Sequence, residues 1–236
     1  SATTGAIIDL GSGADSLTLA DGANSLTVRN VESVTGGTGD DTLSFSGAAM
    51  NGSIDLGSGD DTVTLGHFNN TVTASNVETF TGGNSNDLIT LATAMTAGTV
   101  NLANGTDTLT LGDFANSLTI VGVETVIGGT SDDVVTGGAV LNATINLGAG
   151  DDTLVLGDFV NAVTALNIET ITGGSSSDYV TLGTQVTTGT IDLAGGNDRL
   201  TLGNFANTVT VTSVETLFGG SSADAVTLGD AISGGK

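Results

Sequence analysis

Apolar and polar residues alternate along nearly the whole chain, which is the pattern of short β-strands with one buried face. Clusters of Gly, Asn and Asp, which favour turns, separate the alternating stretches. No segment carries apolar residues at the spacing of a helix face, so we expect very little helix. In one stretch the predicted inward residues are Ile54, Leu56, Val63, Leu65 and Val72, and the predicted outward residues are Asp55, Thr62, Thr64, Thr71 and Thr73.

One alternating segment recurs five times: IDLGSGADSLTL, IDLGSGDDTVTL, VNLANGTDTLTL, INLGAGDDTLVL and IDLAGGNDRLTL. The copies begin at Ile8, Ile54, Val100, Ile145 and Ile191, at intervals of 46, 46, 45 and 46 residues. Tandem repetition of short strands is typical of solenoids, in which each unit pairs with the next. We therefore expect a single β-solenoid domain over 1–236, with repeats at about 7–52, 53–98, 99–143, 144–189 and 190–236.

A second phase of the same period reads VESVTGGTGDDTLSF in the first repeat and VETFTGGNSNDLITL in the second. Each repeat therefore divides into a longer and a shorter unit of related sequence, and each unit contains one marker aspartate. The sequence predicts an all-β, right-handed parallel β-solenoid of about ten rungs, two rungs per repeat. The marker aspartates are Asp15, Asp41, Asp61, Asp87, Asp107, Asp133, Asp152, Asp178, Asp198 and Asp224.

One acidic turn points to a family. GGTGDDTLS, with Gly36, Gly37, Gly39 and Asp41, matches G-G-x-G-x-D-x-U-x, and degraded versions such as GGNSNDLIT occupy the other repeats. The chain resembles the haemolysin-type (RTX-like) calcium-binding repeats of type I secreted bacterial proteins, including repeat-rich S-layer proteins. The resemblance implies Ca²⁺ at the glycine turns, where Gly permits φ > 0 and Asp supplies charged oxygen. The alternative is that the ten marker aspartates are solvated turn residues without a metal.

Three further residue types recur at fixed phases. Every Glu of the chain falls in a V/I-E-T/S motif whose apolar spacing indicates a corner, where it could accept turn amides or act as a second cation ligand. The Asn and Phe of the G-x-F-x-N motif suggest stacked ladders. Outward Thr pairs resemble ice-binding solenoids, although Thr is also a common exposed strand residue. The residues are Glu32, Glu78, Glu124, Glu169 and Glu215; Asn24, Asn70, Asn116, Asn161 and Asn207; and Phe68, Phe114, Phe159 and Phe205.

Composition narrows the possible partners. The formal net charge is −23, with only three Lys and Arg residues, so nucleic acid and acidic membrane surfaces would be repelled. Aromatic residues make up 3% of the chain, which indicates a thin core of aliphatic layers. No apolar run approaches the ~20 residues that a membrane-spanning helix needs, so we expect no membrane insertion. There is no Cys, and SATTGAIIDL lacks the features of a cleavable signal.

Nothing in the sequence resembles a catalytic constellation. His67 is the single His, and Arg29 and Arg199 lie in different phases of the repeat. We expect no enzyme activity. The sequence favours an extracellular structural protein of a bacterial cell surface, which binds Ca²⁺ and further copies of itself and stacks end to end into a layer, sheath or filament. The alternative is an adhesin, ice-binding or carrier module of a larger type I secreted protein, with a cell-surface glycan as a possible partner.

Overall fold

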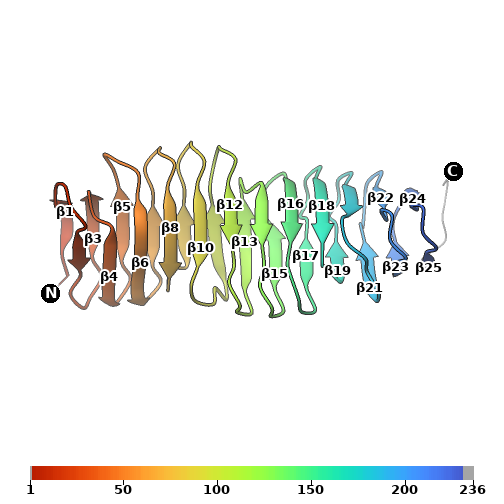
Figure 1. The fold of residues 1–236 in the computed structure, drawn as a ribbon, viewed down its shortest axis with the longest axis horizontal. Coiled ribbons are helices and arrows are strands. Elements are labelled where there is room, and N and C mark those ends of the chain that lie inside the picture. The colour runs from red at the N-terminus through yellow and green to blue at the C-terminus, as the bar shows by residue number, and fades with distance from the viewer. Residues whose placement is uncertain (1, 231–236) are drawn as a thin grey trace.

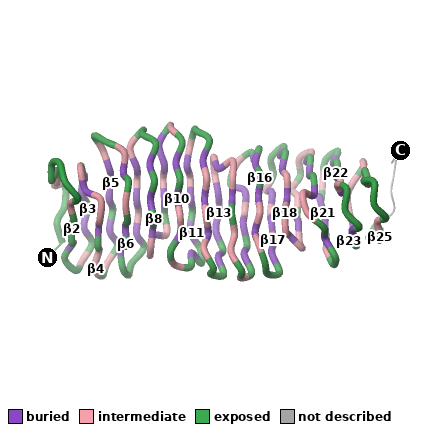
Figure 2. Tube along the Cα trace, in the orientation of Figure 1, coloured by how far each residue is buried: buried purple, intermediate pink, exposed green. Residues whose placement is uncertain are grey.

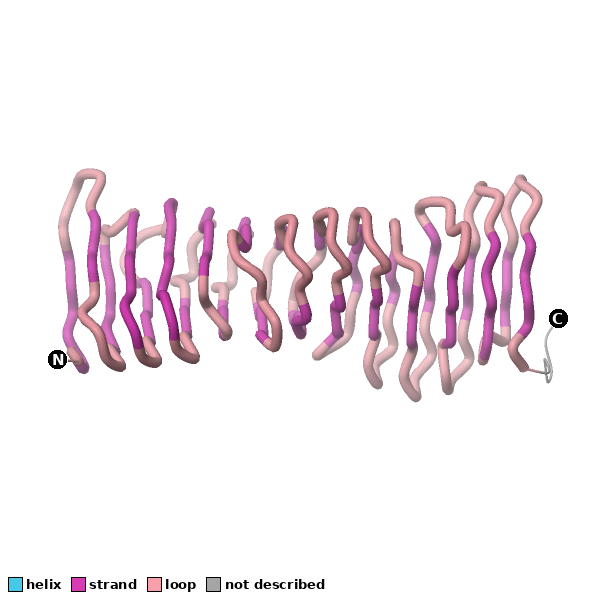
Figure 3. The backbone as a smooth tube through the Cα atoms, turned by 90° about the horizontal axis from the view of Figure 1, so that it is seen from below, coloured by secondary structure: helices cyan, strands magenta, loops and turns pink. Residues whose placement is uncertain are grey.

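The chain forms a parallel β-solenoid of 25 strands in two facing sheets, shown from two directions in Figures 1 and 3. This description rests on a computed structural model, which describes residues 2–230; Ser1 and the end of the last predicted repeat, 231–236, lie outside it. Odd-numbered strands form a 13-stranded sheet and even-numbered strands a 12-stranded sheet, called here the odd sheet and the even sheet. Every strand pair is parallel, and no helix occurs within residues 2–230, so the predicted fold class is confirmed.

The strands are short and regular. The odd sheet consists of β1 (Thr4–Asp9), β3 (Ser25–Arg29), β5 (Thr42–Phe45), β7 (Thr62–Thr64), β9 (Thr79–Thr81), β11 (Gly98–Asn101), β13 (Ser117–Val121), β15 (Val134–Gly137), β17 (Thr153–Val155), β19 (Thr170–Thr172), β21 (Gly189–Asp192), β23 (Thr208–Thr212) and β25 (Ala225–Leu228). The even sheet consists of β2 (Ser16–Thr18), β4 (Ser33–Thr38), β6 (Asn51–Ser58), β8 (Thr71–Ser75), β10 (Leu88–Leu91), β12 (Thr108–Thr110), β14 (Thr125–Ile127), β16 (Asn142–Asn146), β18 (Ala162–Leu166), β20 (Tyr179–Leu182), β22 (Arg199–Thr201) and β24 (Thr216–Phe218).

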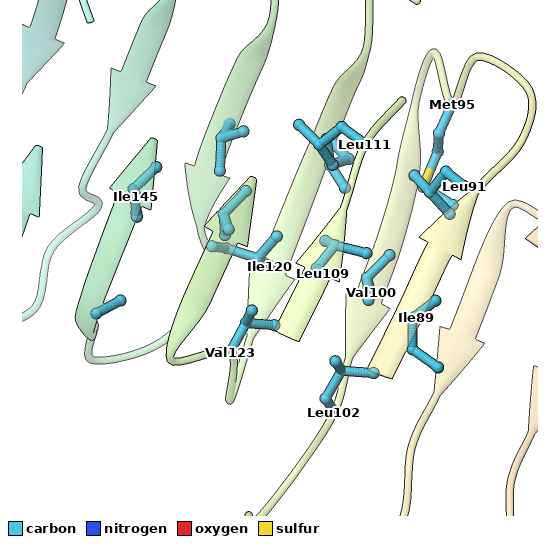
Figure 4. Close-up of a cluster of buried hydrophobic side chains, with 14 of the residues drawn as sticks. Ile89, Leu91, Met95, Val100, Leu102, Leu109, Leu111, Ile120, Val123 and Ile145 are labelled. Carbon is cyan, nitrogen blue, oxygen red and sulfur yellow. The ribbon is translucent and has the colours of Figure 1, made fainter. Parts of the chain in front are cut away.

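A single layer of aliphatic side chains fills the space between the two sheets. Figure 2 shows buried and exposed positions alternating along the strands, and Figure 4 shows inward residues such as Ile89, Leu109 and Ile120 meeting in the interior. The inward residues predicted from the alternation are all buried: Ile54, Leu56, Val63, Leu65 and Val72. The buried core of the described residues is mostly aliphatic, with Phe45 and Phe80 as its rings, which agrees with the low aromatic content.

Each repeat contains five strands and therefore makes two and a half turns, not the two rungs that the sequence predicted. In the shorter unit, between Asp87 and Asp107, lie β10 and β11, which make one full turn. In the longer unit, between Asp61 and Asp87, lie three strands, β7, β8 and β9. The longer unit thus makes one and a half turns, and equivalent positions of successive repeats fall in opposite sheets: Ile54 lies in β6 and Val100 in β11.

The extra strand fits into the longer unit because one corner is very tight. Only Asn76, Val77 and Glu78 separate β8 from β9, and Asn76 takes the left-handed conformation at φ 52°. The equivalent residue is Asn30, Gly122, Asn167 or Ser213 in the other repeats, each with φ between 52° and 57°. Gly and Asn tolerate this conformation best. The predicted corner at the Glu motif is therefore confirmed.

Candidate functional site: two carboxylate–amide columns

The marker residues lie in two columns, one along each edge of the solenoid, at or within three residues of the point where a strand begins. The odd column precedes the odd strands: Thr3, Asn24, Asp41, Asp61, Glu78, Met95, Asn116, Asp133, Asp152, Glu169, Val186, Asn207 and Asp224. The even column precedes the even strands: Asp15, Glu32, Met50, Asn70, Asp87, Asp107, Glu124, Leu141, Asn161, Asp178, Asp198 and Glu215. Both columns follow one five-rung cycle of Asn, first Asp, second Asp, Glu and an apolar residue.

The two aspartates of a cycle lie in adjacent rungs and are joined by a backbone hydrogen bond. The amide N–H of the first aspartate donates to Oδ1 of the second, for example from Asp87 to Asp107 at 2.7 Å. The same bond links Asp41 to Asp61 at 2.6 Å, Asp133 to Asp152 at 2.7 Å and Asp178 to Asp198 at 2.7 Å. One marker aspartate per rung would give a single ladder of ten, but the aspartates instead form pairs that alternate between the two edges.

Asn opens each cycle by supplying two donors to the first aspartate. The backbone N–H and the Nδ2 of Asn116 both donate to Oδ1 of Asp133, each at 2.9 Å. Nδ2 also donates to the carbonyl of Phe114 at 2.7 Å, which ties down the turn. In the column, Asn24 and Asn116 are five rungs apart. The predicted stacked Asn and Phe ladders are therefore wrong, since successive copies of the motif lie on opposite edges.

Glu closes each cycle through a reciprocal pair of bonds. The carboxylate of Glu78 accepts the N–H of Asp61 at 2.8 Å, and the N–H of Glu78 donates back to the Asp61 carbonyl at 3.2 Å. The Glu78 amide needs this second bond, because the next residue of the column, Met95, has no side-chain oxygen that could accept it. All five Glu carboxylates accept such an amide, at 2.7–3.0 Å, so the prediction that they bind turn amides is confirmed.

Eight of the ten marker aspartates are buried. Eight Oδ2 atoms are buried without a hydrogen-bond partner: those of Asp15, Asp41, Asp61, Asp107, Asp133, Asp152, Asp178 and Asp198. Asp87 differs because its Oδ2 accepts the Gly83 amide at 3.0 Å. The tenth aspartate, Asp224, belongs to the last described rung, and hydrogen bonds from Asn207 lower its pKa. A buried carboxylate oxygen without a hydrogen bond costs free energy, so these charged aspartates destabilise the folded state.

The largest increases in pKa occur at the second aspartates. The pKa of Asp107 is raised from 3.8 to about 6: burial is the largest cause, the hydrogen bond from the Asp87 amide opposes it, and the charges of Asp87 and Glu124 add to it. The pKa values of Asp61, Asp152 and Asp198 are also raised to about 6, with burial as the largest cause. Burial raises the pKa of the first aspartate Asp133 as well, but the two hydrogen bonds from Asn116 oppose it.

The paired glycines of the motif are required by close packing between rungs. Gly36 and Gly37 lie within β4 and do not have positive φ, whereas Gly39 does, at 110°. A Cβ on Gly36 would overlap the carbonyl of Leu56 in the next rung, and the equivalent Gly128 meets Leu147 in the same way. The prediction that glycine serves positive-φ turns therefore holds for Gly39, while Gly36 and Gly37 allow the chain to stack.

The donor set does not fit a calcium site built from side chains. Ca²⁺ takes six to eight oxygen ligands, and no group of three or more His, Cys, Asp or Glu residues within 2–230 is arranged to hold a metal. Eight of the marker aspartates each have one orphaned carboxylate oxygen, and the Glu carboxylates already accept amides. Calcium binding at the turns stays a prediction, for which backbone carbonyls and water would have to supply most of the ligands.

The outer surfaces are shallow and largely polar. One groove, of about 340 Å³, lies open over β16, β18 and β20, with Thr144, Thr164 and Tyr179 along it. His67, Arg29 and Arg199 do not meet there. His67 is exposed and accepts the Asn84 amide through Nδ1, while Arg199 lies 4.7 Å from the centre of the Phe218 ring.

Comparison with known proteins returned no relative: no family model, no curated protein and no solved structure matches the chain. In the described part of the chain, no helix is long and apolar enough to cross a membrane. With no relative to compare, the function has to be inferred from the structure of the chain itself.

Proposed function

We propose that the chain is a structural unit of an extracellular assembly at a bacterial surface, in which copies join end to end into a layer, sheath or filament. The observation that carries this proposal is the regular stacking of the described strands: 13 in one sheet and 12 in the other, each paired in parallel with its neighbours, form one continuous rod.

Strands that pair edge to edge within a rod can also pair between copies, and a repeated head-to-tail contact produces a filament when it does not close into a ring. The outward faces support a scaffold role, because they are flat and carry Thr rather than a deep pocket.

The extracellular placement rests on the resemblance of GGTGDDTLS to type I secreted repeats and on the net charge of −23. The resemblance gives less support to calcium-dependent folding, because amides already donate hydrogen bonds to the Asp and Glu carboxylates of both columns. The second candidate, a carrier or adhesin module, is favoured by the resemblance alone.

Sedimentation and negative-stain microscopy of the purified chain test the proposal. We expect concentration-dependent rods longer than one molecule, both in calcium and in a chelator. A chain that stays monomeric at millimolar concentration under both conditions would refute the structural role and favour the module. Thermal hysteresis in the monomer would favour ice binding.

A further inference from the structure

The groove over β16, β18 and β20 lies on the outer face of the even sheet, where β16 and β18 run side by side in Figure 1. Asn142, Ala162 and Tyr179 form one outward row across the three strands, because Ala162 pairs with Asn142 on one side and with Tyr179 on the other. A parallel row of hydroxyl groups runs beside it, formed by Thr144, Thr164 and Thr181.

Differences in side-chain size make the hollow. Outward side chains stand roughly perpendicular to a sheet, about 4.8 Å from their neighbours on adjacent strands. Ala162 contributes a single methyl group between the longer side chains of Asn142 and Tyr179, so the surface dips at β18. The Tyr179 side chain is 49% exposed and forms one wall of the groove, and Glu124 lines the groove beyond β16.

Tyr179 separates this groove from a second hollow of about 210 Å³. The second hollow lies toward β22 and is lined by Arg199 and Thr201 as well as by Tyr179. Arg199 pairs with Tyr179 across the strands, and its guanidinium lies 4.7 Å from the centre of the Phe218 ring. The ring of Tyr179 is therefore a ridge with open space on two sides.

The combination of Ala and Tyr distinguishes the fourth repeat from the others. Tyr179 follows the first aspartate of its cycle, where the other repeats have Thr42, Leu88, Val134 and Ala225. Ala162 follows the Asn of its cycle, where the other repeats have Ser25, Thr71, Ser117 and Thr208. The fold does not require this difference, because the other four repeats form the same strands without it.

The groove offers side chains to a ligand but no free backbone groups. β16, β18 and β20 each pair with a strand on both sides, so a peptide could not bind here by adding a strand. The lining instead combines an aromatic face with neutral hydroxyl and amide groups, which both donate and accept hydrogen bonds. An aromatic face is electron-rich and attracts the C–H groups of a sugar ring, while the lining groups match its hydroxyls. The net charge of −23 disfavours an anionic ligand.

From this lining we propose that the groove binds a neutral oligosaccharide, with one sugar ring packed over Ala162 against Tyr179. The sugar hydroxyls bond to Asn142 and to the row of threonines. The distance from β16 to β20 is two strand spacings, or roughly 10 Å, so the groove holds more than one sugar ring. This inference goes beyond the proposed assembly and does not depend on it.

Tyr179 also supplies the measurement, because the chain has one Tyr and no Trp. The fluorescence of the purified chain excited at the tyrosine band therefore reports on this site alone. The probes are cellohexaose, maltohexaose and chitohexaose, which are neutral hexasaccharides that differ in linkage and in ring substituents. We expect a saturable change in fluorescence with at least one of the three.

Two exposed substitutions on the even sheet locate the binding. Ala162→Leu fills the hollow beside Tyr179, and we expect the affinity to fall about tenfold or more because the sugar can no longer pack against the ring. Leu88→Ala is the matched control: it removes an exposed apolar side chain from the same sheet outside the groove, and the affinity should not change. Leu88 also shows that this face accepts Leu, so circular dichroism of Ala162→Leu should match that of the parent chain.

Three results would overturn the proposal. The first is the absence of a saturable change with all three hexasaccharides. The second is equal affinity of the parent chain and Ala162→Leu, because binding would then lie outside the groove. The third is equally tight binding of an uncharged Gly-Ser peptide of similar length, which would exclude selectivity for sugar. None of these results bears on the proposed assembly, which sedimentation tests separately.

Discussion

Lowering the pH from 7 to 5 is expected to stabilise the folded chain, and Asp107 is the residue with which to test the reason. The pKa values of Asp61, Asp107, Asp152 and Asp198 are about 6 in the folded state, where all four side chains are buried, and 3.8 when the group is unperturbed. The folded state therefore binds protons more readily than the unfolded state between pH 4 and 6. Stability is highest below pH 4 for these groups and falls as the pH rises through 6.

The size of the effect follows from the same values. Between pH 7 and pH 5 each of these carboxyls takes up about one proton in the folded state and almost none in the unfolded state. The gain is roughly 1.4 kcal/mol per group, or about 5 kcal/mol for four independent groups. For a chain of this length that corresponds to a rise in the melting temperature of roughly 10 °C or more.

Thermal melts followed by circular dichroism at pH 7, 6 and 5 measure this gain. Asp107→Asn keeps an oxygen for the Asp87 amide but removes the titrating charge, so its gain should be smaller by about 1.4 kcal/mol, or roughly 3–5 °C. Asp113→Asn is the matched control, because Asp113 is exposed and changes the net charge equally. Equal pH responses in the two variants would refute burial of Asp107 as the cause.

Three further results are expected. Glu124→Ala leaves the Asp107 amide without an acceptor and should cost about 1–3 kcal/mol in the free energy of unfolding, whereas Glu124→Gln keeps the acceptor and should cost less; equal losses would contradict the bond. Gly128→Ala should lower the melting temperature because its Cβ would overlap the Leu147 carbonyl, while Gly195→Ala, whose Cβ has no neighbour closer than 3.6 Å, should be nearly neutral. Chelation should change the melting temperature by less than about 2 °C, since amides already bind the columns; a stabilisation of more than about 5 °C by millimolar Ca²⁺ would show that the turns bind it.

The alternation of apolar residues predicted the strands and the core because burial on one face leaves a direct mark on the sequence. The number of turns per repeat is harder to predict. The Glu motif indicates a corner, but only three residues separate β8 from β9, so the sequence predicts a single rung for the longer unit. The unequal intervals between the aspartates held the missing information, because the longer interval, from Asp61 to Asp87, exceeds one full turn by a strand and a corner.

The aspartate columns could be located from the sequence but not understood from it. Spacing identifies Asp107 and Glu124 as recurring residues, yet it cannot show that a carboxylate points inward to a neighbouring amide. The turn motif with Asp41 suggested a metal because Gly and Asp serve calcium loops equally well. The sequence does not identify Met95 and Leu141 as column members, because an apolar residue there resembles any other core residue when the pairing of the rungs is unknown.

The half-integral number of turns per repeat governs how such a chain can change length. Inserting or deleting one repeat would carry every later residue to the opposite side of the rod, so a surface feature such as the Tyr179 groove would change the direction in which it faces. Gain or loss of repeats in pairs would preserve the facing.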